Sequence, residues 1–307
     1  MDLVNSAAAL RRWTIGSLLG NLGIVFTGGL VRVTESGLGC STWPQCEPGS
    51  YVPHPAAGAH AAIEFGNRLV TFVLVILAVG TFVAAWRARD AAGRPRRDLR
   101  LLALLAGLGI PAQAVIGGIS VLTRLNPWVV SLHLLVSVAI IVVCVVLLHR
   151  AYDKRPAPVP QAVATLTRVV FLLGLVVVVL GTVVTGAGPN SGDGGAERNG
   201  LHLELVAKVH AGSVWLTLLA LLALLWLART IPQVRRAVLL TLGVSVLQGI
   251  IGYSQYFLGN PPALVACHMA GVALFSAALA NVLLAGRGDG AQNRIGSTAA
   301  AMNTSAR

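Results

Sequence analysis

The sequence predicts an all-α membrane protein with eight transmembrane helices in two duplicated four-helix bundles. Three observations predict this fold class. The 307 residues are 55% hydrophobic and only 11% charged, whereas a soluble protein has about 25% charged residues. The apolar residues are collected in runs of about 20, the length of a helix that crosses a bilayer. The two halves of the chain also carry matching residues at a constant spacing.

The apolar runs give the positions of the helices. Each run is close to the ~20 residues that cover ~30 Å of hydrocarbon at ~1.5 Å per residue. The first run is not followed by a small-residue cleavage site, so it is interpreted as a retained helix and not as a signal peptide. The eight runs cover approximately 13–33, 63–86, 100–122, 129–149, 167–187, 203–228, 237–257 and 263–285.

The distribution of lysine and arginine predicts the orientation of these helices. Of the 23 basic residues, 18 lie in the two termini and in the alternate loops on the same side. Because basic residues concentrate on the cytoplasmic side, both termini are predicted to be cytoplasmic. The second, fourth, sixth and eighth helices then enter the membrane from the outer face. The basic residues on the outer side are Arg32, Arg68, Arg124, Arg198 and Lys208.

The same pattern divides the chain into five parts. These are a cytoplasmic N-terminus (1–12), an N-terminal four-helix half (13–150), a cytoplasmic linker (151–166), a C-terminal four-helix half (167–286) and a tail (287–307). The tail is rich in Gly, Ser, Ala and Asn and is expected to be disordered. The net charge of +12 does not indicate nucleic-acid binding, because the basic residues lie in short loops and not on a soluble face.

The two halves resemble each other in sequence. The segment AQAVIGGISVLTRLNPWVVSLHL of the first half matches LQGIIGYSQYFLGNPPALVACHM of the second with a constant shift of 135 residues. Because the four helices of each half run in the same sense, we expect two bundles side by side, related by an axis along the membrane normal. Cofactors in such bundles lie between facing helices. The matched pairs are Gln113 and Gln248, Gly117 and Gly252, Pro127 and Pro262, and His133 and His268.

Three histidines are expected at a similar depth below the outer face, namely His133, His210 and His268, and Asn67 takes the fourth equivalent place. A neutral imidazole in a membrane bundle is costly unless it binds a partner, and haem iron is a common partner of such histidines. His210 and His268 can ligate one iron from both sides, which suits electron transfer or structure. His133 faces a poor iron ligand, so its haem would be exchangeable and a candidate substrate. Satisfied core histidines are the alternative.

Glu64 is the acidic residue best placed for proton transfer. It lies three residues before Asn67 on the same face of the predicted helix, and a carboxyl group at a reacting centre can exchange protons with it. A structural ion pair with Arg68, four residues later, is the alternative, and both can hold. Cations near the outer surface could bind haem propionates, or act as counter-charges to glutamates. The candidates are Arg32, Arg68, Arg124 and Lys208.

The four cysteines divide into two pairs. Cys40 and Cys46 lie in the first outer loop, within GLGCSTWPQC, where six residues of separation on an oxidising side permit a disulfide. A thiol pair used for redox exchange is the alternative. Cys144 and Cys267 lie within apolar runs and are expected to be small buried hydrophobic residues.

Together these motifs resemble the haem A synthase family. The resemblance lies in GGLVRVTESGLGCSTWPQC, then IEFGNRL, then the histidines of the fourth, sixth and eighth helices, and it covers nearly all of residues 13–285. It implies an eight-helix fold of two related halves. It also implies an oxidoreductase that converts a ring methyl of haem O, through an alcohol, to the formyl group of haem A for terminal cytochrome oxidase.

The resemblance implies a role for each candidate ligand. His210 and His268 would be the axial ligands of a resident haem b. His133, with Asn67 and Arg68, would receive the substrate haem O. The family often has histidine where this chain has Asn67, which sets the substrate site of this chain apart.

The resemblance also implies that Glu64 is essential to catalysis. Cys40 and Cys46 match first-loop cysteines thought to form a disulfide or to take part in redox exchange. Some members carry a second cysteine pair in the third outer loop, which here reads GPNSGDGGAERNG and has none. Haem O synthase and cytochrome oxidase assembly factors are the protein partners that such a function suggests, besides the lipid bilayer.

Two other functions fit the same residues. A two-haem membrane cytochrome b that passes electrons from quinol would hold two permanent haems and would not need Glu64. A non-catalytic haem carrier would bind haem without forming haem A.

Overall fold

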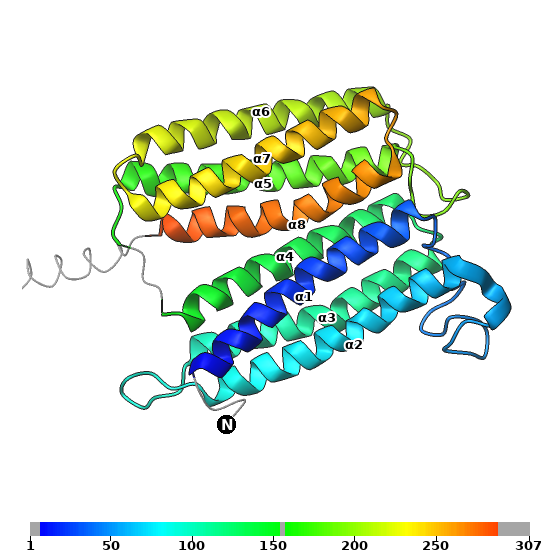
Figure 1. Ribbon diagram of the computed structural model, residues 1–307, viewed down its shortest axis with the longest axis horizontal. Helices are drawn as coiled ribbons and strands as arrows, with labels where there is room; N and C mark the ends of the chain where they lie inside the picture. The colour runs from blue at the N-terminus through cyan, green and yellow to red at the C-terminus, as the bar shows by residue number, and fades with distance from the viewer. Residues whose placement is uncertain (1–6, 154–156, 288–307) are drawn as a thin grey trace, which may run out of the picture.

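The computed structural model describes residues 7–153 and 157–287. Within them, eight α-helices are long and apolar enough to cross a membrane, so the chain is an all-α, multi-pass membrane protein, as predicted (Figure 1). The helices are α1 (Ala7–Val33), α2 (Gly58–Arg87), α3 (Arg97–Leu122), α4 (Pro127–Ala151), α5 (Gln161–Ala187), α6 (Leu203–Leu227), α7 (Pro232–Phe257) and α8 (Pro262–Ala285). A short 3₁₀ helix, η1 (Pro55–Ala57), precedes α2.

The predicted helix positions are confirmed, with longer ends. The helices extend past the apolar runs, most clearly where α1, α3, α5 and α7 begin among polar residues. Of the predicted terminal segments and linker, residues 1–6, 154–156 and 288–307 lie outside the described residues, so the disorder expected of the tail stays a prediction.

Local sequence explains where several helices begin. Pro127, Pro232 and Pro262 occupy the first turns of α4, α7 and α8, where a missing N–H costs nothing because that group has no partner inside the helix. Asn126 caps α4, since its side chain accepts hydrogen bonds from the amides of Trp128 and Val129. These signals start α4 and α8 at equivalent points of the two halves.

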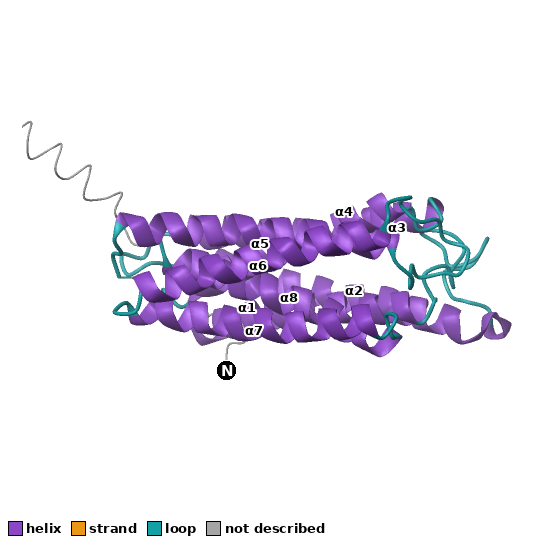
Figure 2. Ribbon diagram, turned by 90° about the horizontal axis from the view of Figure 1, so that it is seen from above, coloured by secondary structure: helices purple, strands orange, loops and turns teal. Residues whose placement is uncertain are grey.

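The helices are grouped in two sets of four, α1–α4 and α5–α8 (Figure 1). Seen from above, all of them run along one common direction, with the longer connections gathered at one end (Figure 2). In each set every helix contacts the next, and the first contacts the last. The two sets meet where α8 contacts α1 and α4, and where α4 contacts α5. This is the side-by-side arrangement of bundles that the sequence predicts, while their relation by duplication stays a prediction.

The bundles are packed solidly at only one end. In the first set, Leu10, Leu99 and Leu147 are almost completely buried, and in the second Leu224 and Val234 are fully buried. All of these lie towards the end where the chain passes from α2 to α3 and from α6 to α7. The other end carries the connecting residues 34–57, 123–126, 188–202 and 258–261, and is called here the disulfide end. The candidate site lies there.

The two cysteines of the helices differ in environment. Cys144 is buried, as predicted, and Cys267 is exposed, so the prediction that it is a buried hydrophobic residue is wrong. The reason is geometric, because adjacent residues on a helix point about 100° apart. With His268 lining the interior, Cys267 points outwards from α8.

Candidate functional site

One continuous cavity of about 1990 Å³ occupies the disulfide end and is lined by residues of both helix sets. A pocket for a drug-sized ligand usually has about 300–1,000 Å³. This cavity therefore has room for more than one large ligand. Its lining is mainly apolar, with a few polar side chains contributed by both sets.

The three predicted histidines all line this cavity, and each ring lies against a glycine of the preceding helix. A Cβ atom on these glycines would come within 3.1 to 3.3 Å of the ring atom Cε1, closer than side chains ordinarily pack. The absence of a side chain therefore lets each imidazole lie close to the neighbouring backbone. The pairs are Gly117 with His133, Gly181 with His210, and Gly252 with His268.

The two nitrogen atoms of each ring differ in environment. The Nδ1 atoms of His133, His210 and His268 are buried and make no hydrogen bond to the described residues. Nε2 is not among these buried atoms without a partner, and all three side chains line the cavity. Buried polar atoms in native proteins nearly always have partners. The three histidines share this pattern and line one cavity, which favours a ligand site over a structural network.

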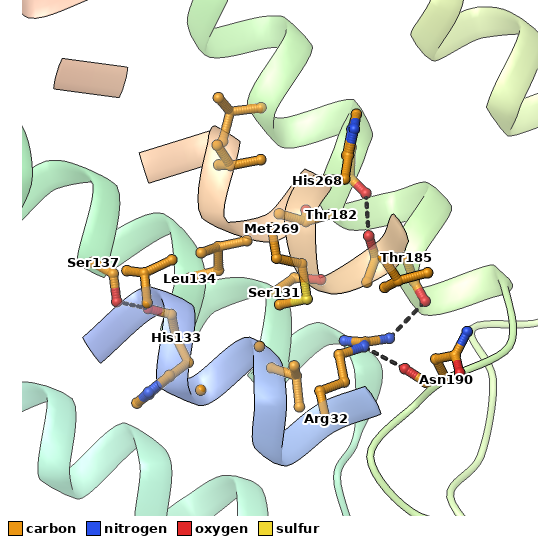
Figure 3. Close-up of a pocket in the computed structure, with 18 of the residues that line it drawn as sticks. Arg32, Ser131, His133, Leu134, Ser137, Thr182, Thr185, Asn190, His268 and Met269 are labelled. Atoms are coloured by element: carbon orange, nitrogen blue, oxygen red, sulfur yellow. Dashed lines mark hydrogen bonds between the residues drawn. The ribbon is translucent and has the colours of Figure 1, made fainter. Parts of the chain in front are cut away.

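The histidines belong to two different parts of the cavity. The ring of His210 lies close enough to His268 to act on it electrostatically. The rings of His133 and His268 point away from each other, and Leu134 and Met269 lie between them (Figure 3). The arrangement therefore offers a site with two histidines in the second set of helices and a site with one histidine in the first.

Within the described residues, no three His, Cys, Asp or Glu side chains form a group that could hold a metal ion. A metal bound by one or two of these histidines would have to bring its other ligands with it. Iron in a porphyrin does so, since the ring supplies four nitrogen ligands and the protein only the axial ones. The donor set and the size of the cavity fit haem.

Asn67 lines the cavity but differs from the histidines, because its side chain has a partner. The Thr27 hydroxyl of α1 donates to Asn67 Oδ1 at 2.7 Å. The carboxamide is thus fixed to the neighbouring helix and is not held free for a ligand.

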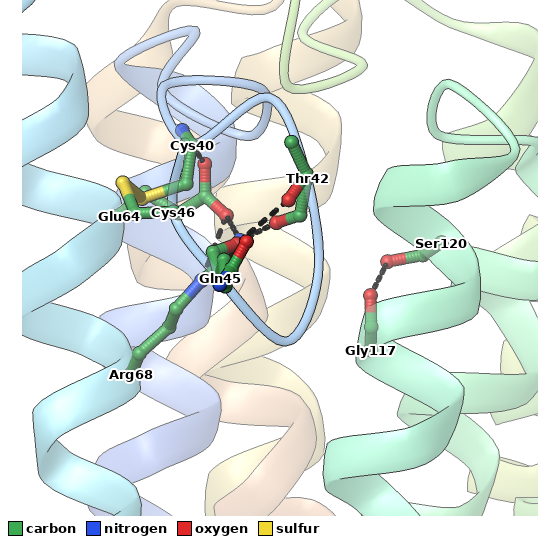
Figure 4. A network of polar contacts seen from close by, with 8 residues as sticks. All are labelled: Cys40, Thr42, Gln45, Cys46, Glu64, Arg68, Gly117 and Ser120. Atoms are coloured by element: carbon green, nitrogen blue, oxygen red, sulfur yellow. Dashed lines mark hydrogen bonds and ion pairs between the residues drawn. A yellow bond between two sulfur atoms is a disulfide. The ribbon is translucent and has the colours of Figure 1, made fainter. Parts of the chain in front are cut away.

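Glu64 is 5% exposed and has partners at both carboxylate oxygens (Figure 4). Arg68 Nη2 donates to Oε1 at 2.6 Å, so the ion pair that the sequence offered as the alternative role of Glu64 is present. The amide of Cys40 donates to Oε2, also at 2.6 Å, and the sequence did not predict this bond. A carboxylate held by a cation and an amide is oriented as well as neutralised.

Cys40 and Cys46 form the predicted disulfide, and both are fully buried. Residues 40–46 are called here the disulfide loop. Arg68 donates to two of its carbonyl oxygens, Thr42 O at 3.1 Å and Gln45 O at 3.2 Å. The loop is therefore attached to α2 through Glu64 and Arg68.

The predicted cations do not all reach the cavity. Arg32, Arg68 and Lys208 line it, and Arg124 does not. Lys208 forms an exposed ion pair with Glu204 at 2.5 Å. Arg32 is buried and has no carboxylate partner among the described residues.

Arg32 links the two sets of helices. It donates to the carbonyl of Thr185 at 2.8 Å and to that of Asn190 at 2.5 Å, so a side chain of α1 holds the end of α5 and the connection after it (Figure 3). The sequence selected Arg32 only as an outer-side cation.

Sequence reasoning missed several residues of the site. Trp43 of the disulfide loop lines the cavity, and Gly181 faces His210. Gln113 donates to the His133 carbonyl at 3.0 Å and also to Ser137 Oγ. The repeat had singled out Gln113 without giving it a role. No periodic signal marks Trp43 or Gly181.

Comparisons with known proteins show which family this chain resembles. A family model for the cytochrome oxidase assembly protein COX15-CtaA matches residues 11–191. The protein named heme A synthase of Lysinibacillus sphaericus is 36% identical over 129 residues, which are 42% of this chain and 40% of the relative. That of Exiguobacterium sibiricum is 28% identical over 170 residues, 53% of each chain. The chain thus matches about half, or less, of the length of these relatives.

Proposed function

The chain belongs to the COX15-CtaA family of cytochrome oxidase assembly proteins, and we propose that it acts as a haem A synthase, the name carried by the relatives that it matches. It would oxidise a ring methyl of haem O, through an alcohol, to the formyl group of haem A for terminal cytochrome oxidase. The observation that carries this proposal is the set of three histidines in one cavity, each against a glycine, with Asn67 at the fourth place.

His210 and His268 would hold a resident haem b as its axial ligands. Their place in one cavity and their equivalent glycine contacts support this assignment. A haem held by two histidines has no open position and supplies one-electron transfer. In this role the two side chains fix the cofactor, while Gly181 and Gly252 give their rings room against the adjacent helices.

His133 would hold the substrate haem O in the first set of helices. The carboxamide of Asn67 bonds to Thr27, and an amide is a poor ligand for haem iron, so the substrate would have one strong axial bond. A substrate must arrive and its product must leave, and a single axial bond favours exchange. Arg32, Arg68 and Lys208 are the cavity-lining cations that could bind the propionates.

Glu64 would exchange a proton at the reacting centre while haem O is oxidised. The carboxylate is held at both oxygens, so its position relative to the cavity is defined. The guanidinium of Arg68 balances its charge before the proton arrives. A positioned carboxylate of this kind can act in general acid–base catalysis.

The distribution of basic residues supports a membrane orientation with both termini in the cytoplasm. The disulfide end, and with it both haem sites, would then lie near the outer face. An oxidising compartment suits the disulfide of Cys40 and Cys46. Haem O synthase and cytochrome oxidase assembly factors would be the protein partners.

Haem content and product formation test the proposal. Protein purified after co-expression with a source of haem O should contain haem b and form haem A. His210→Ala should remove the haem b spectrum, and His133→Ala should abolish haem A while leaving haem b. Glu64→Ala should retain haem b and form no haem A. His202→Ala is a matched control, because His202 does not line the cavity.

Two results would favour the other functions. Two permanent haems with no haem A product, in protein unaffected by Glu64→Ala, would indicate an electron-transferring cytochrome b. Haem binding without any haem A, in a strain that supplies haem O, would indicate a carrier. A protein that takes up no haem at all would contradict the proposal and both of these alternatives.

A further inference from the structure

The disulfide loop is attached to α2 by several polar contacts. Its first residue, Cys40, donates its amide hydrogen to Glu64 Oε2 at 2.6 Å. Its middle and its end accept hydrogen bonds from Arg68, through the carbonyls of Thr42 and Gln45. Glu64 and Arg68 are themselves paired. The loop and the ion pair therefore form one connected network (Figure 4).

The same loop also lies against α3. The indole of Trp43 packs on Gly118 so closely that a Cβ atom there would overlap the ring. Gly118 directly follows Gly117, the glycine that faces His133. Trp43 and the next residue, Pro44, line the cavity. The loop thus spans from the Glu64 carboxylate on α2 to the neighbourhood of His133.

Close packing also fixes where the loop begins. Gly39 lies so near the backbone carbonyl of His60 that any side chain would collide with it. A loop anchored at Gly39, at Cys40 and at Trp43, and closed by a disulfide, has little freedom. The connection between α5 and α6 has no cysteine, so the second set of helices cannot have an equivalent disulfide loop there.

We propose that the disulfide loop determines the shape of the first-half haem site, with Trp43 as a specificity-determining wall beside His133 and the Cys40 amide as the group that positions Glu64. This inference rests on the proposed function of that site. Glu64 is the catalytic residue, and the loop and Arg68 are positioning elements. The disulfide matters because it keeps the Cys40 amide and the Trp43 indole in a fixed relation to each other.

The carboxylate and the loop stabilise each other in this arrangement. A hydrogen bond from an amide to a carboxylate is charge-assisted and short, and here both partners are buried. Removing either partner leaves the other without its bond. The position of Glu64 should therefore depend on the loop, and the order of the loop should depend on Glu64.

Hydrogen exchange of the full-length protein in detergent tests the connection between Glu64 and the loop. In Glu64→Ala, the amides of residues 39–43, 45 and 46 should exchange roughly ten-fold faster, the factor that corresponds to about 1.4 kcal/mol of lost hydrogen bonding. Glu47→Ala is the matched control, because Glu47 accepts from the amide of His54 and not from the disulfide loop. Equal exchange in the two variants would overturn the inference.

The same measurement separates the disulfide from the other cysteines. The double variant Cys40→Ser and Cys46→Ser should show the same faster exchange as Glu64→Ala. Cys267→Ser should not, because Cys267 lies exposed on α8. This readout does not require haem A to be formed, so it stands whether or not the protein proves to be a haem A synthase.

Substrate kinetics test the wall formed by Trp43. Trp43→Ala should raise the KM for haem O about ten-fold with a smaller change in kcat, because it removes a contact that binds the substrate and leaves the Glu64 carboxylate in place. Trp43→Phe should restore most of the affinity. Trp128→Ala is the control, since Trp128 is exposed and does not line the cavity.

A glycine pair on α3 provides an independent check. Gly118→Ala should displace the Trp43 indole and raise KM as Trp43→Ala does, while Gly107→Ala should not, because a Cβ there meets only Ala78 at 3.8 Å. The haem b spectrum should be unchanged in all five Trp43, Trp128, Gly118 and Gly107 variants. If Trp43→Ala and Gly118→Ala form haem A with the same KM as their controls, the proposed role of Trp43 in substrate binding is refuted. The proposed function of the protein would still stand. If the protein without any substitution contains no haem b, that result would instead contradict the proposed haem A synthase function.

Discussion

The position of each candidate histidine ligand depends on a glycine of the neighbouring helix. Gly117, Gly181 and Gly252 let the three imidazoles lie against the neighbouring helices. A larger residue would push the ring into the cavity and change the direction of Nε2. Metal ligation needs this direction to be held closely, so these glycines should matter as much as the histidines do.

A substitution of Gly252 tests this dependence. Gly252→Val adds bulk where a Cβ would already stand 3.3 Å from His268. Overpacking costs about 1–3 kcal/mol, so haem b affinity should fall about ten-fold or more, measured as haem bound per protein. Gly243→Val on the same helix is the control, because nothing lies within 4 Å of a Cβ there. Equal haem content in the two variants would contradict the prediction.

Arg32 contributes through a long side chain and not through the absence of one. It connects α1 to the end of α5, which lies far away in the sequence. Arg32→Met should lower the thermal midpoint of the protein in detergent, because the carbonyls of Thr185 and Asn190 lose a charged donor. Hydrogen bonds to charged groups contribute about 1.5–3 kcal/mol each. Arg124→Met, a change of an exposed arginine at the same end, should leave the midpoint unchanged.

At the scale of elements, the connection between α2 and α3 forms a small structured turn. Asp90 accepts from the amides of Ala92 and Arg94, both at 2.9 Å, and from the Arg94 side chain. The backbone hydrogen bond from Arg94 is the main reason that the pKa of Asp90 lies below its usual value, and the nearby Arg94 charge adds to it.

This lowered pKa predicts how the turn responds to acid. A carboxyl group with a depressed folded-state pKa stabilises the fold at pH values above its ordinary pKa of about 3.9. That contribution is lost as the pH falls through the lowered value. Protection of residues 90–94 from hydrogen exchange should therefore decrease below about pH 4, and Asp90→Asn should be less protected at neutral pH and insensitive to this acidification. A turn that keeps its acid response in Asp90→Asn would contradict this assignment.

The elements also show which sequence signals were sufficient. Apolar runs of membrane-spanning length predicted every helix, because in lipid a helix must satisfy its own backbone hydrogen bonds. The helix ends were less certain, because the helices continue beyond the apolar runs. In α2, for example, the helix begins at Gly58 and includes the polar residue His60. Asn126 and the prolines mark true starts, since capping is a local interaction.

At the scale of the whole molecule, the two sets of helices differ in what their cavities offer. The second set presents two histidines, and the first presents one histidine, an amide with a partner, and a carboxylate held by a disulfide loop. This asymmetry fits a division between an electron-transferring site and a reacting site. It arises from a few side chains within a shared frame.

The membrane orientation is a prediction at this scale. Pro48→Cys lies in an exposed part of the disulfide end, and Ala92→Cys lies in the exposed turn at the opposite end. With Cys267 replaced by serine in both variants, a membrane-impermeant maleimide applied to intact cells should label the first and leave the second unlabelled until the membrane is opened. The reverse pattern would invert the topology and would place both candidate haem sites near the cytoplasm.

The sequence by itself determined the number and positions of the helices, the resemblance of the two halves, and the residue types at the candidate site. These depend on local composition, periodicity and spacing, which a single chain displays directly. It also correctly selected Glu64 with Arg68 as a pair and Cys40 with Cys46 as a disulfide, because both are short-range.

The tertiary structure alone decided which distant residues meet. Trp43 lies on Gly118, Thr27 bonds to Asn67, and Arg32 reaches the carbonyl of Thr185. Such contacts depend on the rotation and offset of each helix against its neighbours, which are set by the summed packing of many side chains. No repeat or composition encodes that sum, so no reading of the chain could have placed the disulfide loop beside His133.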